Sequence, residues 1–346
     1  MLEKLNEGFQ YFLDQGDPRV KNWPLMQTPF PGYAMIAAYI YFVTVAGPRF
    51  MKNRQPYQLN TLMVFYNFLM VIINFAVFMG MGWYGWFNDY SLVCQPVDYS
   101  NAHKAVMMVR FGYLFYLTKF VEFSDTLFFV FRKKYSQITA LHVIHHSIVP
   151  FSLWFGIKFA PGGHNSLFPL MNSFVHVIMY SYYGLAAMGE KYRKYLFWKK
   201  YMTYIQLLQF VVIIVHTASL VINKCDSTYI FICLNFLHAL LFFGLFLNFF
   251  FQTYMKKSAH KSAQAKLSTN YKSTEISNGK LMENGNGSAK HRLSYTFDDG
   301  NDENSRICHE AQRWQDLNGN YNSVVSNAKE RDSPLGDITN GKVKST

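Results

Sequence analysis

Charged residues are scarce in this chain and are almost missing from long parts of it. Only 16% of the 346 residues are charged, and between about residues 33 and 251 the chain is a succession of apolar blocks rich in Phe, Tyr, Leu, Ile and Met. The first 21 residues are polar and carry acids beside a few bases, so we expect no cleavable signal peptide. Apolar blocks of this kind are typical of a protein embedded in a membrane.

The apolar blocks predict an all-α integral membrane protein with seven transmembrane helices. A run of about 20 apolar residues matches the hydrocarbon thickness of a bilayer at the rise of an α-helix. We expect a short N-terminal segment over residues 1–28, a membrane domain over 29–257 and a disordered tail over 258–346, where Ser, Asn, Gly and charged residues dominate. The expected spans are Tyr33–Phe50, Leu59–Gly80, Ala105–Phe131, Gln137–Ile157, Leu167–Met188, Tyr201–Ile222 and Tyr229–Phe251.

Basic residues collect in alternate connections between these spans, which predicts the orientation of the chain. By the positive-inside rule the N-terminus faces the lumen or exterior and the tail faces the cytosol. The basic connections follow the first, third, fifth and seventh spans and carry Arg49, Lys52, Arg54, Arg132, Lys133, Lys134, Lys191, Arg193, Lys194, Lys199, Lys200, Lys256 and Lys257.

The sequence has only four cysteines, and the predicted topology separates them. Cys94 and Cys225 fall in connections outside the cytosol, where an oxidising compartment permits a disulfide bond between them. The alternative is two free thiols. Cys233 lies within the last span and Cys308 in the tail.

Three histidines lie together inside an apolar stretch. His142, His145 and His146 have offsets of three and four residues, so on an α-helix they project from one face. Ionisable groups at membrane depth are costly and mark functional sites. The cluster therefore predicts chemistry inside the membrane; the alternative is that each histidine only hydrogen-bonds a neighbouring helix.

Three further spans carry polar residues at helical spacing. The third span has Lys119, Glu122 and Asp125, which share one face and can neutralise one another. A purely structural ion network is the alternative for this group. The other two stripes are Asn172, His176 and Tyr180 in the fifth span and Thr203, Gln206 and Gln209 in the sixth, where interhelical amide hydrogen bonds alone are the simpler explanation for the two glutamines.

The ordered motifs on these four helices resemble the very-long-chain fatty-acid elongases. The similarity covers about residues 23–257, and the tail does not match it. It is nearest to animal members that use saturated and monounsaturated acyl chains. The helix motifs are Lys119-Phe-Val-Glu122-Phe-Ser-Asp125-Thr126, His142-Val-Ile-His145-His146, Asn172-Ser-Phe-Val-His176-Val-Ile-Met-Tyr180-Ser-Tyr-Tyr183 and Gln206-Leu-Leu-Gln209-Phe210. The similarity also includes Cys94-Gln95-Pro96-Val97-Asp98-Tyr99 in the loop before the third span.

This resemblance implies a membrane enzyme that joins malonyl-CoA to a long acyl-CoA and releases CO₂ and CoA. It also implies a ping-pong course, in which His145 and His176 act together as acyl carrier and proton-transfer partner. No cysteine lies near the polar stripes, and a neutral imidazole can attack a thioester in its place. We expect His142, His146, Asn172 and Tyr180 to orient the pair and to stabilise the oxyanion. No bound cofactor and no metal are expected.

Both substrates carry CoA phosphates, which approach from the cytosol. Arg132, Lys133, Lys134, Lys199 and Lys200 border the expected helix ends there and are candidates to bind these phosphates. The alternative is that they fix topology and contact lipid headgroups. We expect the acyl chain in a tunnel between the helices, with Lys119, Glu122, Asp125, Gln206 and Gln209 near the substrates.

Two other classes of membrane protein remain as alternatives. A di-iron desaturase or hydroxylase also uses histidines on fatty substrates, but only one cluster here has the spacing of metal ligands. A seven-helix receptor or transporter would fit the number of spans, although the third span ends in Phe131-Arg132-Lys133 without a receptor-like Asp-Arg-Tyr.

The elongase resemblance places the protein in the endoplasmic reticulum membrane. Lys342 and Lys344 near the C-terminus resemble a dilysine retrieval signal. Expected partners are membrane lipid and the 3-ketoacyl-CoA reductase and dehydratase of the elongation cycle. A homo-oligomer is possible from the sequence, and nucleic-acid binding is not expected.

Overall fold

A computed structural model describes residues 1–225 and 228–256, and within them the chain is helical and has no β-strand. These residues belong to one compact unit, Met1–Lys272. The predicted tail, with Cys308 and the dilysine pair, lies outside the described residues.

Long helical stretches follow one another along the chain. A single-residue turn at Glu122 separates α5 from α6, and π-helical turns extend α2, α4 and α10 without breaking them. The helices are α1 (Leu2–Asp14), α2 (Phe30–Tyr41), α3 (Gly47–Met51), α4 (Asn60–Met81), α5 (His103–Val121), α6 (Phe123–Phe131), α7 (Ala140–Phe159), α8 (Leu167–Ala187), α9 (Lys199–Ile222) and α10 (Tyr229–Phe250).

Five of these stretches are long and apolar enough to cross a membrane: Phe30–Met51, Asn60–Trp86, Ala140–Phe159, Lys199–Ile222 and Tyr229–Met255. The prediction of an all-helical membrane protein is therefore confirmed. The two remaining predicted spans are also helices, α5–α6 and α8, but they do not meet the same criterion. Buried polar residues such as Lys119, Glu122 and His176 make them less apolar.

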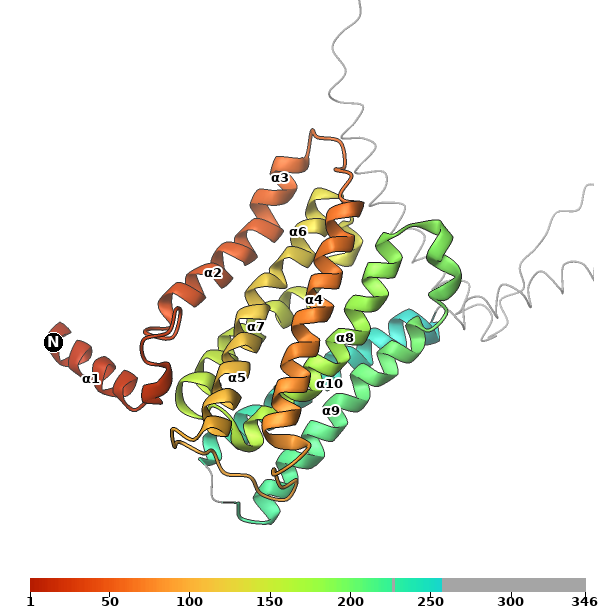
Figure 1. Ribbon diagram of the computed structural model, residues 1–346. Helices are drawn as coiled ribbons and strands as arrows, with labels where there is room; N and C mark the ends of the chain where they lie inside the picture. The colour runs from red at the N-terminus through yellow and green to blue at the C-terminus, as the bar shows by residue number, and fades with distance from the viewer. Residues whose placement is uncertain (226–227, 257–346) are drawn as a thin grey trace, which may run out of the picture. The chain divides into compact units, whose positions relative to one another are not determined.

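The helices form a bundle in which α5 and α8 lie among their neighbours (Figure 1). Helix α4 packs along α8 and against α5, α5 packs on α7, and α9 packs along both α10 and α8. Helix α2 lies against α7, and α3 lies against α6. The helices that carry the predicted polar residues thus lie in contact with one another: α5 contacts α7 and α8, and α8 contacts α9.

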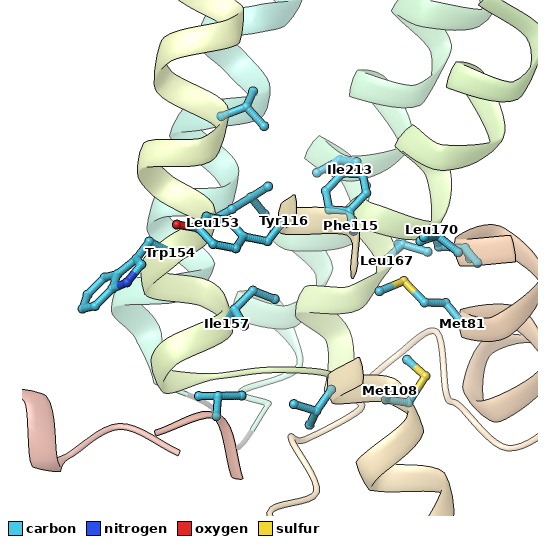
Figure 2. Packing of buried hydrophobic residues seen from close by; sticks show 14 of the residues in the cluster. Met81, Met108, Phe115, Tyr116, Leu153, Trp154, Ile157, Leu167, Leu170 and Ile213 are labelled. Atoms are coloured by element: carbon cyan, nitrogen blue, oxygen red, sulfur yellow. The ribbon is translucent and has the colours of Figure 1, made fainter. Parts of the chain in front are cut away.

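Large apolar side chains fill the largest buried cluster of the bundle, and Figure 2 shows part of it. The cluster includes Phe115 and Tyr116 of α5 and Leu153 and Trp154 of α7. The Trp154 indole donates to the Leu25 carbonyl oxygen at 3.0 Å. Within a membrane, such helices associate through close packing and interhelical hydrogen bonds, because lipid is as apolar as the side chains.

One end of the bundle is closed by a disulfide bond between Cys94 and Cys225, the pair that the sequence analysis joins. We call this the disulfide end. The loop that contains Cys94 is tied to the α7–α8 connection, because the backbone N–H of His164 donates to the Gln95 carbonyl oxygen at 2.7 Å. Gly163 is required here: its φ is +53°, and a Cβ atom would lie 2.8 Å from that same oxygen.

The opposite end of the bundle holds the end of α3, the end of α6 and the starts of α4, α7 and α9. Tyr57, just before α4, donates its backbone N–H to the Phe131 carbonyl oxygen at 3.0 Å. We call this the basic end, because Arg54, Arg132, Lys133, Lys134, Lys199 and Lys200 lie at it.

Candidate active site

A buried carboxylate at the α5–α6 turn joins two helices. Glu122 has no exposed surface, and its Oε1 accepts hydrogen bonds from Lys119 Nζ at 2.7 Å and from His176 Nδ1 at 3.1 Å. An ionised carboxylate only accepts, so the shared proton belongs to the Nδ1 atom of His176. The Nε2 atom of this imidazole then carries a lone pair, which is the form that can act as nucleophile or base.

Lys119 fixes the orientation of a second residue on α8. Its Nζ donates to Asn172 Oδ1 at 3.1 Å. Because an ammonium group can only donate, the amide oxygen must face the lysine and the amide N–H₂ must point away. This N–H₂ group has no hydrogen-bond partner among the described residues and is not sealed off. It is therefore a hydrogen-bond donor that Lys119 holds in a fixed orientation.

Asp125 belongs to a different contact from the one that the sequence suggests. Its Oδ2 accepts the Tyr180 hydroxyl at 2.8 Å, and neither carboxylate oxygen pairs with Lys119. Of the three residues expected to neutralise one another, Lys119 and Glu122 form a direct ion pair, whereas Asp125 lies beyond ion-pair distance of Lys119. Three residues per step fall short of a full helical turn, so Asp125 has rotated toward α4 and α8, where the Tyr66 ring packs on that of Tyr180 at 6.1 Å.

The first histidine of the α7 cluster is tied to two other helices. Thr139 caps α7 by accepting from the backbone N–H of His142 at 3.3 Å. The Nε2 atom of His142 lies 2.7 Å from Thr126 Oγ1 on α6, which in turn lies 2.8 Å from the Tyr39 hydroxyl on α2. This chain of hydrogen bonds holds the start of α7 against α6 and α2.

The other two histidines lie beside the first without such ties. The rings of His142 and His146 have their centres 4.4 Å apart, and those of His145 and His146 are 5.3 Å apart. The three imidazoles therefore form one group, as the spacing predicts. Pro150, one turn after His146, has no N–H, so the carbonyl of His146 lacks its usual helical donor.

His145 faces α10. Its ring contacts Phe242 at 5.1 Å and Phe246 at 6.4 Å, and it is only partly buried. Its ring nitrogens make no hydrogen bond within the described part of the chain. His145 and His176 do not touch, but they are close enough to interact electrostatically. The His176 imidazole is thus oriented by Glu122, whereas the His145 imidazole has no hydrogen-bond partner among the described residues.

The remaining candidates lie apart from this hydrogen-bond network. Gln206 and Gln209 on α9 are buried, but Gln206 reaches only the Met179 sulfur, at 3.8 Å, and Gln209 Oε1 has no partner in the described chain. Lys134, Lys199 and Lys200 are exposed at the basic end, and Lys133 donates to the Lys52 carbonyl oxygen at 3.2 Å. Arg132 rests on Met63 of α4, 3.0 Å from its sulfur.

The sequence analysis did not single out Tyr39, Phe242 or Phe246. Tyr39 lies in an otherwise apolar helix and is 87 residues from its partner Thr126. A buried tyrosine usually finds a hydrogen-bond partner, which was the available signal. Within the described residues, no group of three or more His, Cys, Asp or Glu side chains is arranged to hold a metal ion.

Comparison with known proteins matches the ELO model, described as the GNS1/SUR4 family, over residues 24–262. The chain is 43% identical over 267 residues to very long chain fatty acid elongase 7 of Drosophila melanogaster, covering 77% of this chain and 81% of the relative. It is 44% identical over 257 residues to very long chain fatty acid elongase 1 of Homo sapiens, covering 74% and 92%. The chain therefore belongs to the ELO family of multi-pass membrane proteins.

Proposed function

We propose that this protein condenses a long-chain acyl-CoA with malonyl-CoA to give a 3-ketoacyl-CoA that is two carbons longer. The relatives carry the name of very long chain fatty acid elongase. The observation that supports this chemistry most directly is the Glu122–His176 hydrogen bond, which prepares a nucleophilic imidazole nitrogen among apolar helices.

The first step is acyl transfer to an imidazole. A lone-pair nitrogen of His145 or His176 attacks the carbonyl carbon of the acyl-CoA thioester, a C–N bond forms and the C–S bond breaks. The leaving thiolate takes up the proton that the attacking imidazole loses and departs as CoA. The other histidine of the pair serves as the proton-transfer partner.

The second step forms the carbon–carbon bond. Malonyl-CoA loses CO₂, and the electron pair of the broken C–C bond remains as an enolate. The enolate carbon attacks the acyl-imidazole carbonyl, a C–C bond forms, and the C–N bond to histidine breaks. The leaving imidazole nitrogen takes up one proton from solvent, by way of the other histidine of the pair, and this restores the neutral imidazole. Apolar surroundings protect the acyl-imidazole from hydrolysis.

The neighbouring groups position these reactants. The N–H₂ of Asn172, aimed by Lys119, donates to the oxyanion that develops on the thioester carbonyl. His142, through its bond to Thr126, and His146, which packs on it, hold the histidine face of α7 in place. The hydroxyl of Tyr180 is engaged by Asp125, so Tyr180 is a positioning residue in this proposal.

We infer that α5–α6 and α8 also cross the membrane, giving seven spans around an acyl tunnel. Phe242 and Phe246 beside His145 would form part of its wall, with Gln206 and Gln209 near it. The basic end lies on the cytosolic side of the endoplasmic reticulum membrane, where Lys133, Lys134, Lys199 and Lys200 attract the CoA phosphates. The product is then a substrate for a 3-ketoacyl-CoA reductase and a dehydratase.

The test is turnover of the purified full-length protein with a panel of acyl-CoAs and labelled malonyl-CoA. We expect 3-ketoacyl-CoA from the wild type and at least a 1,000-fold loss, on the order of the effect of removing a catalytic nucleophile or base, in His145→Ala and in His176→Ala. His216→Ala is the matched control, because this buried α9 histidine packs on Trp86 and touches none of the groups above. Near-normal turnover in either of the first two variants would refute the assigned pair.

A further inference from the structure

An apolar groove runs between α4 and α6, on the face of α6 that points away from the histidines. Thr126 and Phe129 of α6 face His142 on α7. Leu127, Phe128 and Phe131 line a cavity of about 500 Å³ on another side of α6, together with side chains that include Leu62, Phe65 and Leu69 of α4. This volume lies within the range of roughly 300–1,000 Å³ that is usual for small-molecule sites.

The length of the groove matches one leaflet of a bilayer. Its α4 wall extends from Leu59 to Leu69, which spans about 15 Å at the rise of an α-helix. The hydrocarbon core of a bilayer is about 30 Å thick, so the groove covers about half of it, starting from the basic end. Leu62, Phe65 and Leu69 are more than a third exposed, so the groove opens to the side where lipid surrounds the bundle.

Two arginines stand at the basic end of the groove without a carboxylate partner. Arg132 follows the groove residue Phe131, and its Nη1 lies 3.0 Å from the sulfur of Met63, the neighbour in sequence of the groove residue Leu62. Arg54 contacts the hydroxyl of the groove residue Tyr57 at 3.4 Å and lies over the Phe50 ring at 4.0 Å. In the part of the chain that the structure describes, neither guanidinium pairs with an acid. Unpaired guanidinium groups are well suited to bind a phosphate oxygen pair.

We propose that this groove binds one acyl chain of an anionic glycerophospholipid, whose phosphate lies between Arg54 and Arg132. The bound chain is separated from Glu122 and His142 by helix α6, so this lipid is not the acyl-CoA that reacts. The assignment moves Arg132 from the CoA phosphates to a lipid phosphate. The lipid proposal does not depend on the proposed function, because it is argued from the apolar groove, the length of the groove and the two arginines at its basic end.

The test uses the full-length protein in mild detergent, loaded with phosphatidylinositol or phosphatidylcholine and examined by native mass spectrometry. We expect one retained phosphatidylinositol per chain. Leu127→Trp fills the groove and should abolish retention of the lipid. Leu62→Trp on the other wall should have the same effect, and it serves as the test if Leu127→Trp does not fold. Ile72→Trp is the matched control, because Ile72 is exposed on α4 but does not line the groove; it should retain the lipid.

The headgroup is tested with Arg54→Gln and Arg132→Gln. Each should weaken phosphatidylinositol retention by roughly fivefold, the factor that corresponds to about 1 kcal/mol per basic residue at a membrane surface. The weaker phosphatidylcholine retention should fall by a smaller factor, because the choline group offsets the charge of the same phosphate. The proposal is overturned if the wild type retains no lipid, if Leu127→Trp and Leu62→Trp retain as much as Ile72→Trp, or if phosphatidylcholine binds equally well. Displacement of the lipid by acyl-CoA, or a dimer in its place, would also overturn it.

Discussion

At the level of single residues, the proposed mechanism depends on how Glu122 holds His176. One carboxylate oxygen holds both Lys119 and His176, while the second oxygen, Oε2, is buried without a partner among the described residues. Such an arrangement is costly in a membrane unless it is used. In the proposed mechanism the Glu122 carboxylate fixes the tautomer of His176 and, through Lys119, orients the amide of Asn172.

Glu122→Gln removes the charge that holds the Nδ1–H of His176. We expect kcat to fall on the order of 10²–10⁴-fold with little change in KM, because the imidazole loses its fixed tautomer while substrate contacts remain. Steady-state kinetics of the purified variant over a range of acyl-CoA concentrations measure both values.

The single variant also leaves Lys119 buried and unpaired, which destabilises the fold by roughly 3–5 kcal/mol. A double variant, Lys119→Met with Glu122→Gln, removes both charges and should recover most of the melting temperature but none of the turnover. A double variant that is both stable and active would show that the pair is structural only.

At the scale of helices, hydropathy predicts well where each helix lies but not how its faces are used. The expected spans agree with the observed helices to within a few residues, because each helix ends near the point where the apolar run gives way to polar residues. The spacing of His142, His145 and His146 predicted their common group. Spacing alone could not show that α6 divides its contacts, with Thr126 toward α7 and Asp125 toward α8, because that depends on which helices pack on it.

Long-range contacts were likewise beyond the sequence. The bond from Thr126 to Tyr39 and the ring contact of His145 with Phe242 join residues that lie 87 and 97 positions apart. In each pair the second residue, Tyr39 or Phe242, belongs to a helix without a distinguishing motif. The groove between α4 and α6 arises from side-chain shape on two helices and leaves no periodic signal. The disulfide pair was predictable because topology left only two cysteines on one side of the membrane.

The disulfide joins the loop before α5 to the α9–α10 connection across 131 residues of sequence. Cys94→Ser, or Cys225→Ser, should lower stability by about 2–5 kcal/mol, because the unfolded chain regains the freedom of a long loop. The measurement is the apparent melting temperature in detergent without reductant.

Cys233→Ser is the control for this change, because Cys233 is a free and exposed cysteine of α10. It should leave the melting temperature unchanged. Equal melting temperatures for all three variants and the wild type would contradict a stabilising role for the bridge.

At the level of the whole molecule, we propose that the basic end and the tail face the cytosol and that the disulfide end faces the lumen. The orientation follows from the alternate basic connections, and it determines from which side CoA can reach the histidines. Cys308, in the part of the tail outside the described residues, is a native reporter of this orientation.

In sealed microsomes that carry the Cys233→Ser variant, a membrane-impermeant thiol reagent should label Cys308 without detergent. Cys94 and Cys225 should become reactive only after reduction and permeabilisation, since they are bonded to each other. The tail also carries the glycosylation sequon Asn286-Gly287-Ser288. Labelling of Cys308 only after permeabilisation, or a glycan on Asn286, would reverse the assigned topology.

The acyl-imidazole is the central claim, and one measurement tests it directly. The purified protein is incubated with labelled acyl-CoA in the absence of malonyl-CoA, then digested and examined by mass spectrometry. The account predicts one free CoA released per acyl group retained, with the acyl mass on the peptide of His145 or His176, and no adduct in His145→Ala or His176→Ala. Product formation on later addition of malonyl-CoA with no prior adduct, or an adduct on any other residue, would contradict it.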